Sequence, residues 1–550
     1  MNAVSNYSLQ LPGADLKSMS LVSVYIRRAV IRSLWSSITI RPSDEYDLHD
    51  ITTEGFPHLY IPYVSELHFA APLELGSTGC PHSYGSWEER GKFFERLDQR
   101  AKSFLDKFEK TKLRSFSWDM GCCVPETILG EDGLLARMHP SLESLRLVVD
   151  PKCRFFYQRS RFTDHGNMGL SSFRNLKSIC WKGSVINSHH LLGTVIEKNA
   201  DHLDHLELDL LYTDGDFSRA RVHVQRHEGD NDPGYFGNIL KLHEHTVQPI
   251  FQSLTSLVLT NVPLGPAMVG MINFEVLRSL TLRLCPGWAR FTQRIVKTRP
   301  PVRLKTLELR HGLSAPVKNS QLEVEQFIDV CGGLEELFLN LPKPDDARSI
   351  WKHITRHEAS LKRLVLHYRT KERHAHGFSE QETDLPSLGL TEHGNTIYYP
   401  PEPNPLQELK LECISLCCFP ELAELMLETS SSLASLKFVH IRKASFDYRP
   451  PNPITGERAS PQIPTPLLWF AEWAFGPDGP PLLEAVAYGK FSHGGWAHAD
   501  NLILCPTRDW FRTVPRDGRE WVGIVGKYRN ALEACPVEPF LGSSGPRYGT

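Results

Sequence analysis

The chain has 550 residues, of which 61 are Lys or Arg and 64 are Asp or Glu, and its formal net charge is -3. This balance provides no global attraction to nucleic acid or to an acidic membrane surface. The sequence lacks the basic, apolar and small-residue pattern of a secretory leader, and it contains no uninterrupted apolar run long enough to span a bilayer. We therefore expect a cytoplasmic or nuclear protein, with neither nucleic acid nor membrane as a partner.

The first organised segment covers residues 15–40. Apolar residues recur every three or four positions from Leu16 to Leu34, and polar and apolar residues alternate from Ser36 to Ile40. Asp15 is a suitable helix N-cap. The pattern predicts a helical segment followed by a short strand.

One motif, Leu-x-x-Leu-x-Leu (the leucine motif), recurs along most of the chain. Its last residues are expected to form a short strand whose alternate side chains point into a core, while the first Leu closes the preceding helix or turn. The strict copies are LESLRL (142–147), LDHLEL (203–208), LTSLVL (254–259), LRSLTL (277–282), LKTLEL (304–309), LEELFL (334–339), LKRLVL (361–366) and LQELKL (406–411). Looser copies are VSELHF (64–69), LRSFSW (113–118), LKSICW (176–181), LASLKF (433–438) and LEAVAY (483–488).

The spacing between copies predicts one strand and one helix per repeat. From Leu254 to Leu361, successive copies start 23 to 30 residues apart. Segments with apolar residues at helical spacing lead into several copies, namely 191–203, 324–334, 349–361 and 421–433. Each unit has an apolar face that it cannot bury alone, so neighbouring units are expected to stack into an α/β solenoid of short parallel strands and helices.

This repeat pattern resembles the leucine-rich-repeat family, in its longer class with a helix in each repeat. The resemblance implies an irregular solenoid over 46–490. Long insertions near 209–250, 367–405 and 441–466, rich in Gly, Pro and charged residues, are expected to be either binding loops or disordered. Residues 491–550, which contain three Trp among Gly and Pro, are expected to form an irregular C-terminal cap.

With these repeats behind it, the N-terminal segment resembles the second half of an F-box. DLKSMSLVS (15–23), Arg27, Arg28 and SLW (33–35) match the family pattern, and fungal F-box proteins commonly join this module to leucine-rich repeats. The family's first helix, which starts Leu-Pro-x-Glu, has no counterpart in residues 1–13, so we interpret residues 1–45 as a partial F-box-like helical segment. The resemblance implies that a Skp-family adaptor is contacted by Leu16, Met19, Leu21, Val22, Leu34 and Trp35.

Together the two resemblances imply a non-catalytic substrate-recognition subunit of an SCF-type (Skp-cullin-F-box) ubiquitin ligase, whose strands hold a protein substrate of unknown identity. The strand residues expected to contact this partner are Thr255, Ser256, Arg278, Ser279, Lys362 and Arg363. Two alternatives stay open. In the first, the chain is a stand-alone leucine-rich-repeat scaffold that no longer binds the adaptor. In the second, residues 15–40 only cap the open edge of the first repeat.

No motif predicts catalysis, a cofactor or a metal. The Gly-x-Gly-x-x-Gly, Walker-type and Gly-x-Ser-x-Gly patterns are absent. His353 and His357 have the i, i+4 spacing of helical metal ligands, but Ile354 stands where the zincin pattern requires Glu. The twelve cysteines form no CxxC pair, which predicts buried free thiols in a reducing compartment. A hidden enzyme would need a deep polar pocket that no motif indicates.

Overall fold

The structure is a computed structural model of the chain. It describes residues 13–42, 51, 58–71, 87–109, 112–149, 168–185, 189–211, 237, 239, 249–311, 320–342, 348–374, 377–383, 390–392, 395–397, 404–442, 463–491, 501–508, 510–516 and 518–536.

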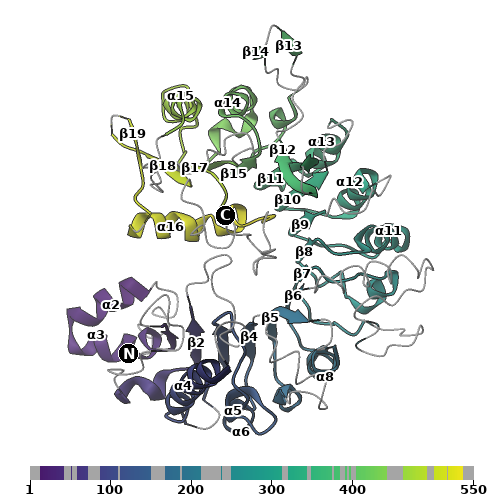
Figure 1. The fold of residues 1–550 in the computed structure, drawn as a ribbon. Coiled ribbons are helices and arrows are strands. Elements are labelled where there is room, and N and C mark those ends of the chain that lie inside the picture. The colour runs from purple at the N-terminus through teal and green to yellow at the C-terminus, as the bar shows by residue number, and fades with distance from the viewer. Residues whose placement is uncertain are drawn as a thin grey trace. The chain divides into compact units, whose positions relative to one another are not determined.

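The chain divides into two compact units, and the boundary in the sequence falls within strand β7 (Ser256–Thr260). Unit 1 comprises residues 1–257 with 270–273 and 544–550, and unit 2 comprises 258–269 with 274–543. Both units are α/β, with a mostly parallel sheet and helices that follow its strands (Figure 1).

Unit 1 contains a parallel sheet in which each strand pairs with the next one along the chain. The strands are β1 (Ser37–Ile40), β2 (Glu66–Ala70), β3 (Ser115–Asp119), β4 (Ser144–Val148), β5 (Ser178–Val185) and β6 (His205–Leu211). The helical segments are α2 (Gly13–Val22), α3 (Val24–Leu34), η1 (His58–Tyr63), α4 (Trp87–Leu105), α5 (Glu126–Leu129), α6 (Leu134–Met138), η3 (Gly169–Ser172) and α8 (His189–Asn199). The predicted strand after the N-terminal helical segment is therefore confirmed, and the helical segment itself is two helices.

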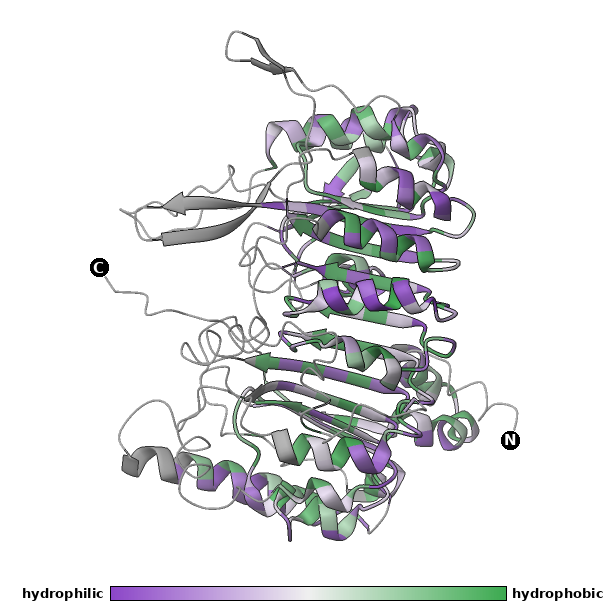
Figure 2. Ribbon diagram, turned by 90° about the vertical axis from the view of Figure 1, so that its right-hand side faces the viewer, coloured by the Kyte–Doolittle hydropathy of each residue, from purple (hydrophilic) through white to green (hydrophobic). Residues whose placement is uncertain are grey.

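Unit 2 repeats the arrangement and ends differently. Its parallel strands are β8 (Ser279–Arg283), β9 (Thr306–Arg310), β10 (Glu336–Pro342), β11 (Arg363–His374), β15 (Cys413–Leu416), β16 (Phe438–Ile441) and β17 (Ala485–Tyr488). The helices that follow strands are α11 (Trp288–Thr298), α12 (Ser320–Val330), α13 (Arg348–Ile354), α14 (Pro420–Glu428) and α15 (Thr465–Ala474), with 3-10 turns η5 (Pro266–Met271), η6 (Thr355–His357), η7 (Pro405–Gln407) and η8 (Ser431–Ala434). Helices and strands both carry hydrophobic and hydrophilic residues, as expected of elements that bury one face (Figure 2).

The leucine positions of successive strands lie side by side and form the core. In unit 1 the register aligns Ile38, Leu67, Phe116, Leu145, Ile179 and Leu206, and all of these side chains are buried. In unit 2 it aligns Leu280, Leu307, Leu337, Leu364, Ile414, Val439 and Val486, which are buried as well. Side chains alternate between the two faces of a strand, so the residues between the leucines lie on the opposite face of the sheet.

A shared backbone carbonyl sets the start of each strand. The carbonyl of Lys177 accepts hydrogen bonds from the amides of both Asp204 (2.8 Å) and His205 (3.0 Å). In unit 2 the carbonyl of Glu335 likewise accepts from Lys362 (2.9 Å) and Arg363 (3.1 Å). The same double acceptance recurs at the second residue of most leucine motifs, so neighbouring strands begin level with each other.

Two predicted strand positions are wrong. In LQELKL (406–411) the leucines are buried in a turn, because the Asn404 side chain caps η7 by accepting from the amide of Leu406 (3.0 Å). Strand β15 starts later, at Cys413, and the copy of the motif that pairs in register is LECISL (411–416). In the same way LASLKF (433–438) is mostly the turn η8, and LKFVHI (436–441) supplies β16.

Part of the second predicted insertion has regular structure. Strand β11 continues to His374 and forms an antiparallel hairpin with β12 (Gly377–Thr383), and β13 (Leu390–Glu392) pairs with β14 (Asn395–Ile397). His367 and Arg369, at the start of the insertion, are buried strand residues. Most of the predicted insertions at 209–250 and 441–466 lies outside the described residues.

The C-terminal segment has more regular structure than the predicted irregular cap. Strand β18 (Leu502–Pro506) pairs antiparallel with β17, and β19 (Phe511–Thr513) pairs antiparallel with β18. Helices α16 (Arg519–Lys527) and α17 (Arg529–Leu532) follow. The helices pack on the sheet face opposite the leucines, where the ring of Tyr528 stacks on that of Phe438 at 4.1 Å. They bury Phe338, Val365, Cys413 and Phe438 in one cluster with Trp521 and Leu532.

This packing predicts a difference between two tryptophans of the same segment. Trp521 is buried against Phe491, with ring centroids 5.8 Å apart, whereas Trp510 is 56% exposed. Trp521→Ala should lower the free energy of unfolding by about 3 to 5 kcal/mol, because it empties part of this core. Trp510→Ala should lower it by less than about 1 kcal/mol. Urea unfolding measures both, and equal losses would contradict the core role of α16.

Candidate interaction surfaces

Helices α2 and α3 form a hairpin ahead of β1. Ser23 separates the two helices and caps α3, since its hydroxyl accepts from the amide of Ile26 (3.2 Å). Arg27 Nε donates to the carbonyl of Ser20 (3.0 Å) and ties α3 to the end of α2. The apolar face of α3 is anchored by Val30, which is fully buried. The hairpin is thus held by a cap, a cross-helix hydrogen bond and a small apolar contact.

The turn of this hairpin exposes a cluster of apolar side chains. Leu21 is 72% exposed, Val22 71%, Val24 61% and Tyr25 74%. Scattered apolar residues are common on protein surfaces, but four large ones within five positions form a patch of the kind found at protein–protein contacts. This patch is called the hairpin patch.

The six residues expected to contact an adaptor lie in three environments. Leu21 and Val22 belong to the hairpin patch, Leu16 is buried, and Met19, Leu34 and Trp35 are half-buried. The ring of Trp35 stacks on that of Tyr60, with centroids 4.4 Å apart and planes at 14°. Val24 and Tyr25 were not among the expected residues, although their place directly after the helix break is visible in the sequence.

The sheet face opposite the leucines carries the second surface. The register of unit 1 aligns one residue from each strand along the middle of this face (the central row), namely Thr39, His68, Ser117, Arg146, Cys180 and Glu207. Every member is polar or a thiol. The corresponding row of unit 2 is Thr281, Glu308, Phe338, Val365, Ser415, His440 and Ala487. Its apolar members, Phe338, Val365 and Ala487, belong to the cluster beneath the C-terminal helices.

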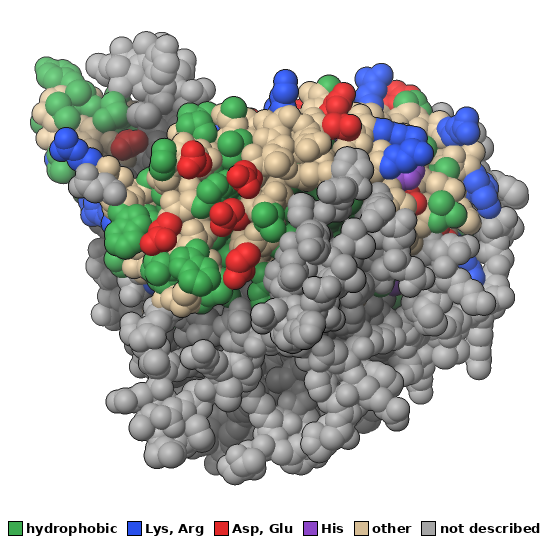
Figure 3. Space-filling view, turned by 90° about the horizontal axis from the view of Figure 1, so that it is seen from above, with side chains coloured by type: hydrophobic (Ala, Val, Ile, Leu, Met, Phe, Trp, Pro, Cys, Tyr) green, Lys and Arg blue, Asp and Glu red, His purple; other side chains and the backbone are tan. Residues whose placement is uncertain are grey.

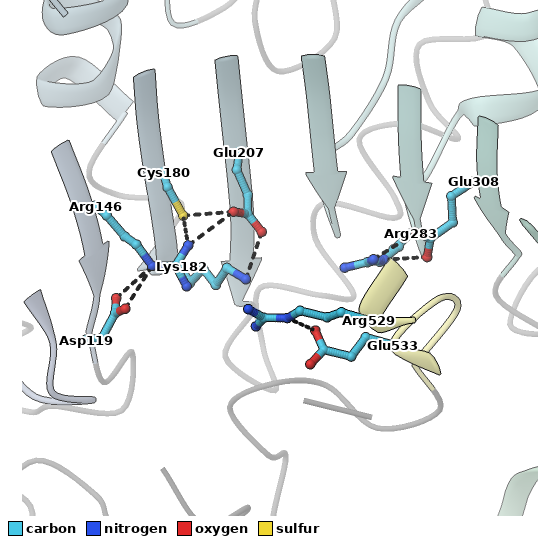
Figure 4. A network of polar contacts seen from close by, with 9 residues as sticks. All are labelled: Asp119, Arg146, Cys180, Lys182, Glu207, Arg283, Glu308, Arg529 and Glu533. Atoms are coloured by element: carbon cyan, nitrogen blue, oxygen red, sulfur yellow. Dashed lines mark hydrogen bonds and ion pairs between the residues drawn. The ribbon is translucent and has the colours of Figure 1, made fainter. Parts of the chain in front are cut away.

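A network of charged groups joins the four strands β3 to β6 on the unit 1 face (Figure 4). Arg146 Nε is 2.9 Å from both carboxylate oxygens of Asp119, and its Nη1 is 3.4 Å from Glu207 Oε2. Lys182 Nζ lies 2.7 Å from Glu207 Oε1. Between them, Cys180 Sγ donates to Glu207 Oε2 at 3.0 Å, while Arg146 Nη1 donates to Cys180 Sγ at 3.1 Å. The network is partly exposed, since 35% of the Arg146 side chain and 15% of that of Glu207 are accessible.

The charges of this network shift two pKa values in opposite directions. Burial favours a raised pKa for the Glu207 carboxyl, but Lys182 and Arg146 outweigh it and lower this pKa to about 2. Burial and the neighbouring Glu207 raise the pKa of the Cys180 thiol well above its usual value. Because a thiolate is the reactive form of cysteine, Cys180 is a hydrogen-bond donor here and not a nucleophile.

The corresponding face of unit 2 is occupied by the chain itself. Arg283 pairs with both carboxylate oxygens of Glu308 at 2.6 and 2.8 Å, and Glu308 Oε1 also accepts from the amide of Cys535 (2.7 Å). Further along the sheet, Arg442 Nη1 contacts the carbonyl of Ala534 (3.4 Å). These polar contacts fasten the segment after α17 to the strands.

A buried serine and two histidines lie under this segment. Ser415 Oγ is 2.8 Å from His440 Nδ1 and 3.1 Å from His367 Nε2, and Arg442 Nη1 is 2.7 Å from His367 Nδ1. Burial lowers the pKa of His440 to about 3. All three side chains are fully buried, so this Ser–His pair is a structural hydrogen-bond network with no access for a substrate.

Of the six strand residues expected to contact a partner, three have side chains that join neighbouring repeats, namely Thr255, Lys362 and Arg363. Thr255 Oγ1 donates to the carbonyl of Asp204 (3.0 Å), and Arg278 Nη1 to that of Glu275 (2.7 Å). Lys362 pairs with Glu335 at 3.0 Å, and Arg363 pairs with Glu336. Ser256 and Ser279 are the first residues of β7 and β8 and are half-buried.

The sequence prediction did not include the residues of the central row, because it selected other positions of the leucine motif. The expected residues are the second and third of Leu-x-x-Leu-x-Leu, which lie before or at the start of the strand. The single residue between the last two leucines is at the middle of the strand on the far face. Reading that position along the sequence would have found Arg146, Cys180 and Glu207, and also the apolar change at Phe338 and Val365.

No protein-family model matches the chain, and no curated protein shows significant similarity to it.

Within the described ranges, no three His, Cys, Asp or Glu side chains are grouped so that they could hold a metal ion. His353 lies 2.8 Å from Asp329, and His357 Nε2 is 3.2 Å from the carbonyl of Ile328. None of the described helices combines the length and the apolar character needed to cross a membrane.

The ion pairs of Glu207 predict a pH-dependent contribution to stability. Its folded pKa is about 2 and its ordinary value is 4.5, so the contribution is present above the ordinary value and is lost as the pH falls through the folded one. Glu207→Gln should therefore lower the free energy of unfolding by about 3 kcal/mol at neutral pH. The difference from the unsubstituted protein should shrink between about pH 4.5 and pH 2.

Urea unfolding at several pH values measures this difference. Glu143→Gln is a matched control, because Glu143 pairs with Lys177 at 3.1 Å on a side chain that is 35% exposed. The loss of such a surface pair should cost less than about 1 kcal/mol. A Glu207→Gln protein as stable as the control at neutral pH would contradict the role of the network.

Proposed function

We propose that the protein is a non-catalytic interaction protein that acts as a substrate-recognition subunit of an SCF-type ubiquitin ligase. In this proposal the α2–α3 hairpin binds a Skp-family adaptor, and the repeats, as leucine-rich repeats, hold a protein substrate. The observation that carries it is the hairpin patch, an exposed apolar turn on the segment that resembles half of an F-box.

The geometry of the hairpin supports a docking role. Leu21 and Tyr25 are more than two-thirds exposed and stand on a turn that is held by the Ser23 cap and the Arg27 hydrogen bond. An apolar patch on a preorganised turn loses little conformational entropy on binding. Strand β1 continues directly from α3 into the sheet, which couples the hairpin to the repeats.

The substrate is assigned to the strand face of unit 1. Its central row is polar and partly exposed, whereas the equivalent row of unit 2 is buried throughout. Arg146 and Glu207 present both signs of charge from neighbouring strands. A partner that brings its own paired charges and hydrogen-bonding groups suits such a face.

A stand-alone scaffold is the second candidate. The stacking of Trp35 on Tyr60 and the cation–π contact of Arg32 with Tyr63 at 6.0 Å join the end of α3 to η1. These contacts favour a segment that covers the first repeat without recruiting an adaptor. The two candidates differ only in whether the hairpin patch binds.

Calorimetric titration of a purified Skp-family adaptor into the full chain tests the proposal. We expect binding by the unsubstituted protein and at least a tenfold loss of affinity in a Leu21→Asp/Tyr25→Asp variant, because both side chains would be buried in the contact. The variant should keep its unfolding midpoint, since both residues are exposed in the free protein.

Leu322→Asp is the matched control for this experiment. Leu322 is 50% exposed on α12 in unit 2, so its substitution should leave adaptor binding unchanged. An unsubstituted chain that does not bind the adaptor would refute the ligase proposal and leave the scaffold. Equal binding by the hairpin variant would refute the assignment of the patch.

A further inference from the structure

Helices α14 and α15 of unit 2 pack against each other and form a surface distinct from the hairpin patch and from the strand faces. Seen from above, this part of the molecule shows hydrophobic and acidic side chains gathered together, on the left of the view (Figure 3). The two segments that build it, 419–436 and 463–489, contain no Lys or Arg, although the chain as a whole has 61 of them.

The carboxylates of α14 follow one face of the helix. Glu421, Glu424 and Glu428 are spaced three and four residues apart, so their side chains are neighbours. Burial and the charges of Glu428 and Glu421 raise the pKa of Glu424. None of these three has an ion pair with a residue that the structure describes. Among the described residues, the group is therefore a row of like charges without a counter-charge.

Helix α15, which packs against α14, carries an exposed aromatic residue and a further acid. Trp469 is 57% exposed, and Glu472 and Trp473 follow it on the same helical face. Large exposed aromatics are the residue type most enriched among energetic anchors of protein contacts. On the same helix, the ring of Trp473 contacts that of Phe470, with centroids 5.5 Å apart. The anchor, Trp469, therefore stands on a helix that is packed through neighbouring side chains.

The position of these charges within the helices is unfavourable for the isolated protein. Glu428 and Glu472 lie in the last turns of α14 and α15, neither of which carries a basic residue there. The C-terminal end of a helix bears partial negative charge, so an anion at this end is destabilising, as are like charges at i, i+3 and i, i+4. A cationic partner would remove both penalties.

We infer that the face formed by Glu421, Glu424, Glu428, Trp469 and Glu472 binds a basic amphipathic segment of another protein. Lys or Arg side chains of that segment pair with the row of carboxylates, and an apolar side chain packs on Trp469. Charge complementarity selects the sign of the partner, and the tryptophan distinguishes an amphipathic partner from one that is merely basic. The inference does not depend on adaptor binding or on the substrate face.

Fluorescence anisotropy with labelled peptides and the full chain tests it. The probes are an amphipathic peptide of Lys and Leu, a peptide with Ser in place of Leu, and one with Glu in place of Lys. We expect only the Lys/Leu peptide to bind the unsubstituted protein with salt-dependent affinity. Trp469→Ser should weaken this binding at least about tenfold, and Glu424→Gln/Glu428→Gln about fivefold.

A charge exchange separates this site from general acidity and from misfolding. In Glu424→Lys/Glu428→Lys the Lys/Leu peptide should lose affinity and the Glu/Leu peptide should gain it, which a misfolded protein would not do. Leu59→Ser is the control for Trp469→Ser, because Leu59 is 82% exposed in unit 1. The inference is overturned if the Lys/Ser peptide binds as well as the Lys/Leu peptide, or if either set of variants binds like the unsubstituted chain.

Discussion

The arrangement of the strands depends on one backbone interaction, a carbonyl just before most parallel strands that accepts amide hydrogen bonds from two residues of the next repeat. The carbonyls of Lys177 and Glu335 are examples from the two units. Where one carbonyl accepts from two amides, neighbouring parallel strands start at the same level, and the period of two along a strand then determines which face each side chain occupies. A shift by one residue would turn the leucines outward. The carbonyl pairs and the buried leucines therefore reinforce each other, and neither alone would determine the register.

Once the leucines occupy one face, the residue between them lies on the other face, and its polarity differs with what covers that face. In unit 1 this position holds Arg146 and Glu207, whose charges are paired across strands and remain partly exposed. In unit 2 it holds Phe338 and Val365, which are buried by the chain's own C-terminal helices. One sheet architecture thus has a polar, partly exposed row in unit 1 and a row in unit 2 whose apolar members are buried by internal packing. The two rows differ in their side chains and not in the strand backbone that carries them.

Much of this could be predicted from local sequence, and the failures have physical reasons. The strands of the strict copies from Leu142 to Leu361 follow from spacing alone. The strand predicted at 406–411 is wrong because LECISL, five residues later, satisfies a similar pattern and pairs in register. The side chain of Asn404 caps a turn over the first copy, which leaves the second copy to form the strand. The placement of α16 and α17 depends on contacts between residues far apart in sequence, such as Phe438 with Tyr528, which no local period encodes. Of the hairpin patch, Leu21 and Val22 were predicted, and Val24 and Tyr25 were not, because apolar periodicity does not show which side chains are exposed at a helix break.

In-register stacking also explains why some surface charges are paired between repeats, while an unpaired row of like charges points to a binding partner. Equivalent positions of neighbouring repeats lie side by side, so like charges there would repel. The chain avoids this where Glu335 lies between Lys305 and Lys362, at 2.7 and 3.0 Å, and hydrogen bonds from both lysines lower the pKa of Glu335. Such alternating pairs join repeats and need no partner. The carboxylates of α14 have no such alternation, and the helix spacing that brings Glu424 near Glu428 leaves their repulsion uncompensated within the described structure. The row of α14 differs in this from the paired charges of Glu335 and Glu207, and it is where a contribution from another molecule is expected.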